Sequence, residues 1–167
     1  MSDAFVDEWH SRDLDATILQ REVDAVDAWK KTDYAFHVMR DHPQHTTDIL
    51  GGMFGMRQNT QKRRKERREE FWKMIQEFGP KWVKGSDQYA LAKIVSPRAA
   101  KDSLVHDSYL CQSGYLKGSQ IEAFPSQRIS GANSSVINFV GNTSKYGIQI
   151  ECPTKCRPKN HQGWLYC

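Results

Sequence analysis

The chain has 167 residues, of which 38% are hydrophobic, and it carries a formal net charge of +4 at pH 7. This length suits one domain with one core, and an aromatic content of 11% argues against a disordered chain. No apolar run approaches the roughly 20 residues that span a bilayer, and the N-terminus has no signal-peptide pattern, so nothing in the sequence explains export.

Apolar spacing predicts a strand, a helix and a second strand in the first part of the chain. Residues 4–10 alternate loosely between apolar and polar side chains, as strands do. A capping-box pattern opens the helix that we expect over residues 17–31. The compact apolar segment 35–39 predicts the second strand, and the proline-broken segment 40–45 predicts a loop.

The middle of the chain alternates glycine-rich and helical segments. Three glycines in five residues within segment 49–55 indicate close backbone approach to a neighbour or a ligand. Helices are expected over residues 61–78 and 85–95, the second with Ser86 as its N-cap and Pro97 beyond its end.

Two extended segments follow in the last third of the chain. Residues 104–109 predict a short strand, and residues 135–140 form the one clear late strand signal. Strands that alternate with helices predict the α/β or α+β class.

Six of the seven residues in segment 62–68 are basic. Such a run suits nucleic-acid binding or a nuclear address. It also suits the solvated face of a helix, because acidic residues follow at i,i+4 spacing and an apolar stripe comes next. We favour the helix face, since little aromatic stacking pattern accompanies the charge, and we do not expect a nucleic-acid partner.

The chain has four cysteines, three of them in the last sixteen residues: Cys111, Cys152, Cys156 and Cys167. Their spacing suits a zinc module poorly, so disulfides that pin the tail to the domain are the better interpretation. Disulfides imply an oxidising compartment, such as the Golgi lumen or the extracellular space. The glycosylation acceptors Asn133-Ser-Ser and Asn142-Thr-Ser agree with this, although such triplets often arise by chance.

Asp13 and Asp15 lie at the expected carboxyl end of the first strand, the edge where α/β sheets bind ligands. Residues i and i+2 of an extended segment point the same way, so both carboxylates can face one Mg²⁺ or Mn²⁺ ion. The alternative is that they complement the dipole of the following helix. His106 is a second candidate ligand, or else a satisfied core histidine.

Two further polar clusters can bind a ligand. Arg40, His42 and His45 offer hydrogen-bond donors for phosphate or sugar hydroxyls, unless they only solvate a loop. Asp87 and Gln88 can hydrogen-bond a polyhydroxylated substrate, or merely complement a helix dipole. The motifs of serine hydrolases, P-loop proteins and zincins are absent from the sequence.

In their order along residues 5–141, these motifs resemble a family of glycosyltransferase-like proteins. The Met-Arg-Asp-His-Pro stretch and the following Gly-Gly are the most specific part. The segments that carry the resemblance are Ser11-Arg-Asp-Leu-Asp15, Arg21-Glu22, Ala25-Val26, Phe36-His-Val-Met-Arg-Asp-His-Pro43, Ile49-Leu-Gly-Gly-Met53, Asp87-Gln88, His106-Asp-Ser108, Phe124-Pro-Ser-Gln-Arg128 and Asn138-Phe-Val-Gly141.

This family is similar to nucleotide-sugar transferases of the GT-A fold, including glycogenin-like enzymes. The resemblance implies a mixed sheet flanked by helices over residues 1–150, as the carboxyl-side portion of such a domain, and a cysteine-containing tail over residues 151–167. It further implies Mn²⁺ (or Mg²⁺) at Asp13, Asp15 and His106, the transferred sugar at Asp87 and Gln88, and substrate contacts from Arg12, Arg40, Asp41, His42, Gly51 and Gly52.

The expected function is metal-dependent transfer of a sugar, of the hexosyltransferase type, from a nucleotide-sugar donor to a glycan, glycoprotein or small acceptor. The alternative is a non-catalytic carbohydrate-binding or interaction protein with a degenerate transferase fold. The sequence does not choose between retention and inversion at the sugar carbon.

Overall fold

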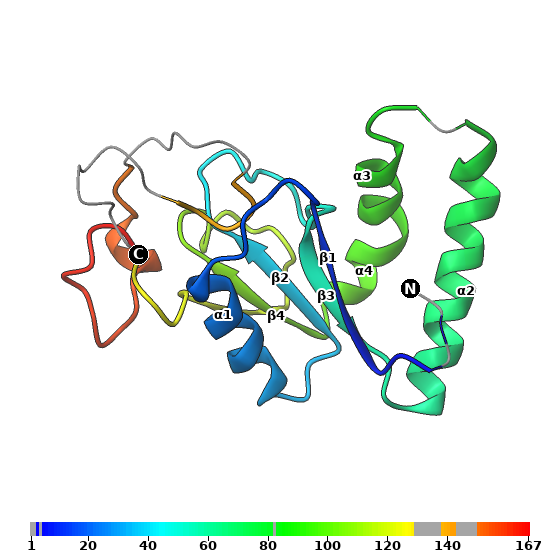
Figure 1. The fold of residues 1–167 in the computed structure, drawn as a ribbon, viewed down its shortest axis with the longest axis horizontal. Coiled ribbons are helices and arrows are strands. Elements are labelled where there is room, and N and C mark those ends of the chain that lie inside the picture. Colours follow the sequence, from blue (N-terminus) through cyan, green and yellow to red (C-terminus); the bar gives the residue numbers. More distant parts are fainter. Residues whose placement is uncertain (1–2, 4, 82, 129–137, 143–149) are drawn as a thin grey trace.

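The computed structural model describes residues 3, 5–81, 83–128, 138–142 and 150–167. Its centre is a five-stranded sheet, formed by β1 (Glu8–Arg12), β2 (Phe36–Arg40), β3 (Met53–Arg57), β4 (Ser103–Asp107) and β5 (Gln120–Glu122). The strand order is β1-β3-β2-β4-β5 (Figure 1). β3 is antiparallel to both β1 and β2, whereas β4 is parallel to both β2 and β5. An α/β class with a mixed sheet is therefore confirmed.

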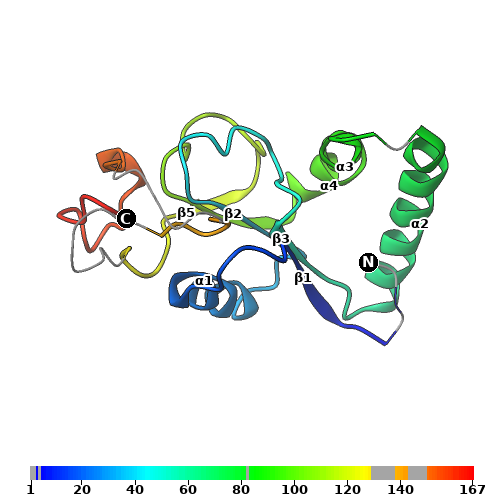
Figure 2. The ribbon, with the colours of Figure 1, turned by 45° about the horizontal axis from the view of Figure 1, so that its top comes forward.

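Helices cover both faces of the sheet. One face carries α1 (Gln20–Lys30), and the other carries α3 (Ser86–Ala90), the π-helix η2 (Leu91–Val95) and α4 (Ser96–Ala99) (Figure 2). The long helix α2 (Gln61–Phe78) stands on the outer side of α3 and α4 (Figure 1). Two short 3-10 helices, η1 (Gly79–Lys81) and η3 (Thr154–Cys156), complete the described elements.

Alternation along the strands divides the core between the two faces, because successive strand residues point in opposite directions. Phe36 and Val38 of β2 belong to the apolar cluster that contains Leu91 of η2. Met39, the next residue, belongs to the cluster that contains Ala25 of α1.

The structure confirms the helix over residues 61–78, where the Thr60 side chain accepts a hydrogen bond from the backbone N–H of Arg63. β2 lies within one residue of its prediction. The bounds of the first strand and helix were wrong: β1 continues to Arg12, and α1 begins at Gln20 after Leu19, whose side chain makes no cap.

The helix that follows Gly85 was predicted with the wrong cap and the wrong end. Gly85, at φ +89°, is the N-cap in place of Ser86. Pro97 was expected beyond the end of the helix, but it lies inside the helical stretch, in the first turn of α4. A proline is tolerated in a first turn, because its missing N–H costs little there. β3 and β5 were not predicted. Of the late strand, residues 135–137 lie outside the described residues, and residues 138–140 form no strand.

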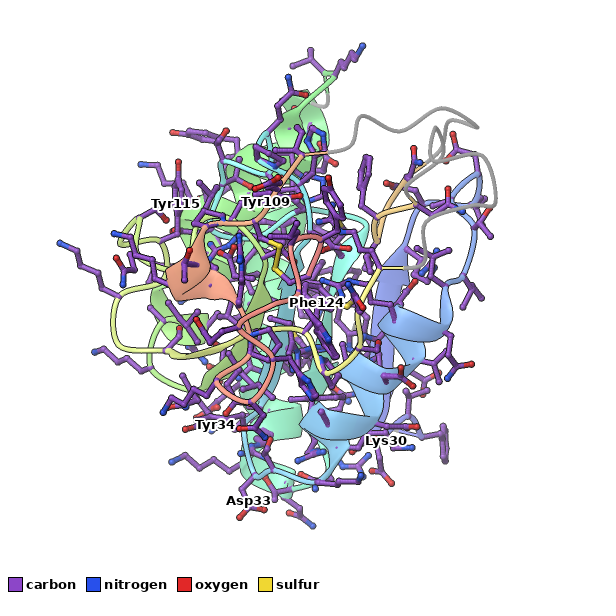
Figure 3. All side chains as sticks on the ribbon, turned by 90° about the vertical axis from the view of Figure 1, so that its left-hand side faces the viewer. Lys30, Asp33, Tyr34, Tyr109, Tyr115 and Phe124 are labelled. Carbon is purple, nitrogen blue, oxygen red and sulfur yellow. A yellow bond between two sulfur atoms is a disulfide. The ribbon has the colours of Figure 1, made fainter. Side chains whose placement is uncertain are left out.

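Disulfides hold the C-terminal tail, as expected. Cys111–Cys156 ties the tail to the segment after β4, and Cys152–Cys167 closes the tail on itself. Figure 3 views this end of the molecule, where Tyr109 packs in a cluster with Cys152 and Cys167. The two disulfides agree with an oxidising compartment.

The acceptor Asn142 is only 9% exposed, so this fold offers a glycan little access to it; Asn133 lies outside the described residues. Among the helices that the structure describes, none is long and apolar enough to cross a membrane.

Part of the basic run on α2 forms ion pairs within the fold. Arg67 is buried, pairs with Glu70 and lies over the ring of Phe36 at 4.4 Å. Arg98 of α4 also pairs with Glu70, at 2.9 Å. Burial raises the pKa of the Glu70 carboxyl, against the opposing effect of these two arginines. The run therefore attaches α2 to α4 and the sheet.

Candidate functional site

An open pocket of about 450 Å³ lies where β1 ends and β3 begins, and it is named here the Asp13 pocket. Three separate segments bring five of the residues expected at a site to its wall: Asp13, Gly51, Gly52, Asp87 and Gln88. The pocket is bordered on its apolar side by Phe54 and Leu91. The structure thus collects residues that are far apart in the sequence.

Asp13 follows β1 directly, and its side chain lies against Gly52. A Cβ atom added at Gly52 would stand 2.5 Å from the carboxylate carbon of Asp13, well inside van der Waals contact. The backbone of this glycine forms part of a tight turn, in which the N–H of Met53 donates to the carbonyl of Leu50 at 3.1 Å. A glycine at position 52 is therefore what admits the Asp13 carboxylate to this wall.

Gly51 likewise admits side chains from the start of α3 to the wall of the pocket. A Cβ atom at Gly51 would stand 2.8 Å from the Gln88 amide and 3.4 Å from Oδ2 of Asp87. The Gln88 amide, oriented to satisfy both partners, donates to the carbonyl of Ile49 at 3.2 Å and accepts from the N–H of Gly51 at 2.7 Å. Gln88 therefore holds the glycine turn, whereas the carboxylate of Asp87 is exposed to solvent.

Arg12 and Asp15 are neighbours of Asp13 that do not border the pocket. The Arg12 guanidinium donates to the carbonyl of Ala16 at 3.1 Å and forms an ion pair with Glu22 of α1. Burial lowers the pKa of Arg12, and the charge of Asp13 partly offsets this. Arg12 thus ties the turn after β1 to α1, while Asp15 is exposed on the same turn.

Asp41 is fully buried at the end of β2, at the centre of a hydrogen-bonded group that we name the Asp41 network. Its carboxylate accepts two bonds from Arg21 (both 3.0 Å), and one each from Ser108 (2.6 Å), Arg128 (2.8 Å) and the N–H of Val140 (3.0 Å). Burial opposes ionisation, but the two arginines and the Ser108 hydroxyl lower the pKa of Asp41 to about 2. The carboxylate is therefore ionised and fully engaged, with no surface for a substrate.

Arg40 and His42 flank Asp41 and also do not border the pocket. Nε of Arg40 pairs with Asp107 at 2.8 Å, and both side chains are fully buried. His42 is half-buried, packs against Phe139 at 4.6 Å between ring centroids and accepts a hydrogen bond from the N–H of Gln44. Burial lowers the pKa of His42. Their observed contacts are with the protein's own loops and strand ends.

His106 lies in β4 on the face covered by α1, where it forms one end of a histidine row made of His10, His37 and His106. Nδ1 of His106 and Nε2 of His37 are 2.8 Å apart, and the ring of His10 lies 5.5 Å from that of His37. Gly55 of β3 leaves room for the His10 ring between the strands. Burial lowers the pKa of His10 and His106 to about 4, and burial with the neighbouring histidines lowers the pKa of His37 well below its usual value.

The structure does not bring His106 to the Asp13 pocket. His106 instead borders a separate cavity of about 610 Å³ between β5 and the C-terminal tail. Within the described part of the chain, no three His, Cys, Asp or Glu side chains are grouped so that they could hold a metal ion. A Mg²⁺ or Mn²⁺ ion shared with a phosphate ligand needs only one or two protein carboxylates, however, and Asp13 and Asp87 border one pocket. The residues fit such a shared ion and not a closed protein cage.

Two further residues border the pocket, one expected and one not. His45 was expected, with Arg40 and His42, to donate hydrogen bonds to phosphate or sugar hydroxyls, and of these three residues it is the one that borders the pocket. Gly141 also borders it, at φ +84°, where an added Cβ would meet the sulfur of Met53 at 2.7 Å. No local pattern identifies Gly141, because its role depends on a contact with β3.

Comparisons of the chain with protein-family models, with curated proteins and with solved structures found no match. The fold itself defines an α/β protein with a mixed five-stranded sheet and an open acidic pocket at one end of it.

Proposed function

We propose that this chain carries out metal-dependent sugar transfer from a nucleotide-sugar donor to an acceptor hydroxyl. One observation carries the proposal: Asp13 and Asp87, from distant parts of the sequence, lie against the consecutive glycines Gly52 and Gly51 in one open pocket. Two exposed carboxylates on a wall without side chains suit a ligand that is both charged and rich in hydroxyls.

Each pocket residue has a role in this proposal. Asp13 would hold Mn²⁺ or Mg²⁺ together with the donor diphosphate, with Asp15 exposed on the same turn but outside the pocket. When bound, the ion stabilises the negative charge that develops on the leaving nucleoside diphosphate. Asp87 accepts hydrogen bonds from the hydroxyls of the transferred sugar, and Gln88 holds the Ile49–Gly51 turn against which the sugar lies.

The transfer breaks the bond between the sugar carbon C1 and the diphosphate oxygen, and the bonding electrons leave with the diphosphate. A new bond forms between C1 and the acceptor oxygen, whose proton passes to solvent. The glycine wall matters here because a Cβ at Gly52 would displace the Asp13 carboxylate and a Cβ at Gly51 would displace the Gln88 amide.

A non-catalytic carbohydrate-binding protein is the second candidate. It is favoured by the position of His106, which lies away from the pocket and leaves the described residues without the expected third metal ligand. Such a protein binds sugar without any need for a metal ion.

The test is a thermal-shift measurement with Mn²⁺ and UDP or GDP. A ligand present at about 100 times its Kd stabilises the folded state by ~2.7 kcal/mol, so the melting temperature of the wild type should rise. The double variant Asp13→Asn/Asp15→Asn should lose this shift. The matched control is Asp27→Asn/Asp33→Asn, which removes two exposed aspartates remote from the pocket and should keep it.

Absence of a shift in the wild type with both nucleotides would overturn the proposal. A shift produced by free glycans without Mn²⁺ would favour the second candidate.

A further inference from the structure

His45 is a pocket residue whose tautomer the structure defines. Its Nδ1 accepts a hydrogen bond from the backbone N–H of Asp41 at 3.0 Å. A ring nitrogen that accepts carries no proton, so the proton of the neutral imidazole lies on Nε2. His45 thus has one committed acceptor nitrogen and one N–H donor.

The surroundings of His45 keep the ring neutral and restrict its rotation. Burial lowers its pKa to about 4, the charge of Asp41 opposes this effect, and His42, Arg128 and Arg40 add to it. The ring packs against both His42 and Phe139, with centroid distances of 5.6 and 5.7 Å. At neutral pH the pocket therefore contains a neutral and oriented donor.

Nε2 of His45 makes no hydrogen bond to the described residues and is not sealed from solvent. Asp13 and Asp87 at the pocket are carboxylates and can only accept, whereas the Ser11 hydroxyl, which also borders the pocket, can donate or accept. A sugar hydroxyl donates one hydrogen bond and accepts others, so a sugar that donates to a carboxylate still needs a donor for its oxygen. His45 meets this need with an N–H whose orientation is fixed by the bond from Asp41.

We infer that His45 binds the sugar of the donor nucleotide, by donating from Nε2 to a hydroxyl oxygen in the Asp13 pocket. This inference rests on the proposed function, because it assumes that a nucleotide sugar occupies the pocket. It assigns to His45 a contact with the sugar and not with the diphosphate.

Two substitutions separate ligand contact from a structural role. His45→Asn keeps an acceptor near the position of Nδ1, and so the bond from Asp41, but does not reach the position of Nε2. His45→Gln places an amide N–H close to the position of Nε2 and gives up the Nδ1 position. We therefore expect the glutamine variant to bind the sugar better than the asparagine variant does.

The experiment measures the affinities of UDP, UDP-glucose, GDP and GDP-mannose with Mn²⁺ by calorimetry. His45→Asn should weaken binding of the sugar nucleotide that the wild type prefers by about 3- to 10-fold, the value of one neutral hydrogen bond, and leave the parent nucleoside diphosphate unchanged. His45→Gln should recover part of this loss. His161→Asn is the control, because His161 is an exposed histidine of the C-terminal tail that does not border the pocket, and it should bind as the wild type does.

Each failure has its own signature. If the wild type binds none of the four probes, both the proposed function and this inference are overturned. If the wild type binds and His45→Asn weakens nucleotide and sugar nucleotide equally, or neither, the inference alone is wrong. If the glutamine variant is impaired while the asparagine variant is not, the role of His45 is structural.

Discussion

Two aspartates follow β1 and β2, which both pair with β3, and the two side chains have opposite environments. The Asp41 carboxylate after β2 is 0% exposed and accepts hydrogen bonds from four residues. The Asp13 carboxylate after β1 is exposed and makes no hydrogen bond or ion pair with the described residues. The carboxylate of Asp41 is therefore structural, whereas the carboxylate of Asp13 is available to a ligand. The difference arises because Asp41 is buried with hydrogen-bond partners.

The Asp41 network also explains why several of the segments that carry the glycosyltransferase-like resemblance lie close together in the fold. Arg21, Ser108, Arg128 and Val140 all donate to this one carboxylate, and they come from α1, the end of β4 and the loops beyond β5. Through its own N–H, Asp41 also holds His45 at the pocket. The network thus supports the site without contacting what the site binds.

The largest effect is expected from Asp41→Asn. This change leaves Arg21 and Arg128 buried without their counter-charge, so the free energy of unfolding should fall by about 3–5 kcal/mol. Urea denaturation followed by circular dichroism measures it. Asp27→Asn, an exposed aspartate of α1, should stay within about 0.5 kcal/mol of the wild type. A loss below ~1 kcal/mol for Asp41→Asn would show that the network does not carry this stability.

The histidine row extends the comparison between Asp41 and Asp13, because its side chains are largely without charged partners. Burial lowers the pKa of His10 from 6.5 to about 4, and its two ring nitrogens have no hydrogen-bond partner among the described residues. As the pH falls, His10 is therefore protonated in the unfolded chain before it is protonated in the folded protein. The free energy of unfolding is unaffected by this proton above pH 6.5 and decreases as the pH falls from 6.5 toward 4. Asp41, with a pKa lowered from 3.8 to about 2, loses its contribution only below that window, between about pH 3.8 and 2.

His10→Phe tests this order. Phenylalanine fills a similar space beside Trp29 and does not titrate, so the variant should be more stable than the wild type by ~1–2 kcal/mol at pH 5 and nearly equal to it at pH 8. Urea denaturation at both pH values measures the difference. An equal offset at the two pH values would mean that the proton on His10 is not the cause.

The smallest effect on stability is expected from Gly52→Ala. The new Cβ displaces the Asp13 carboxylate, but that side chain is exposed and can rotate away, so the free energy of unfolding should change by less than ~1 kcal/mol. Binding of UDP with Mn²⁺, measured by calorimetry, should nevertheless weaken on the order of tenfold, about 1.4 kcal/mol. Gly163→Ala, where an added Cβ meets nothing within 4 Å, is the matched control. If Gly52→Ala binds UDP with Mn²⁺ as the wild type does, Asp13 does not contact the ligand.

Elements with strong periodicity were predictable from the sequence, and short glycine-rich ones were not. The apolar stripe of α2 and the apolar run of β2 identified both elements. β3 contains Gly55, and glycine is not favoured inside a strand. In the structure the His10 ring fills the space above this glycine. β5 has only three residues, so it shows no period at all.

By itself, the sequence determined the α/β class, the use of disulfides to hold the tail, and a set of polar residue types at strand ends. It could not rank those residues, because Asp13, Asp41 and Asp107 look alike in a linear pattern. Only the tertiary structure separated them, by covering Asp41 and Asp107 with arginines from distant segments and leaving Asp13 over a glycine at an open pocket. The physical reason is that a carboxylate's role depends on its water and its partners, and both are set by long-range packing.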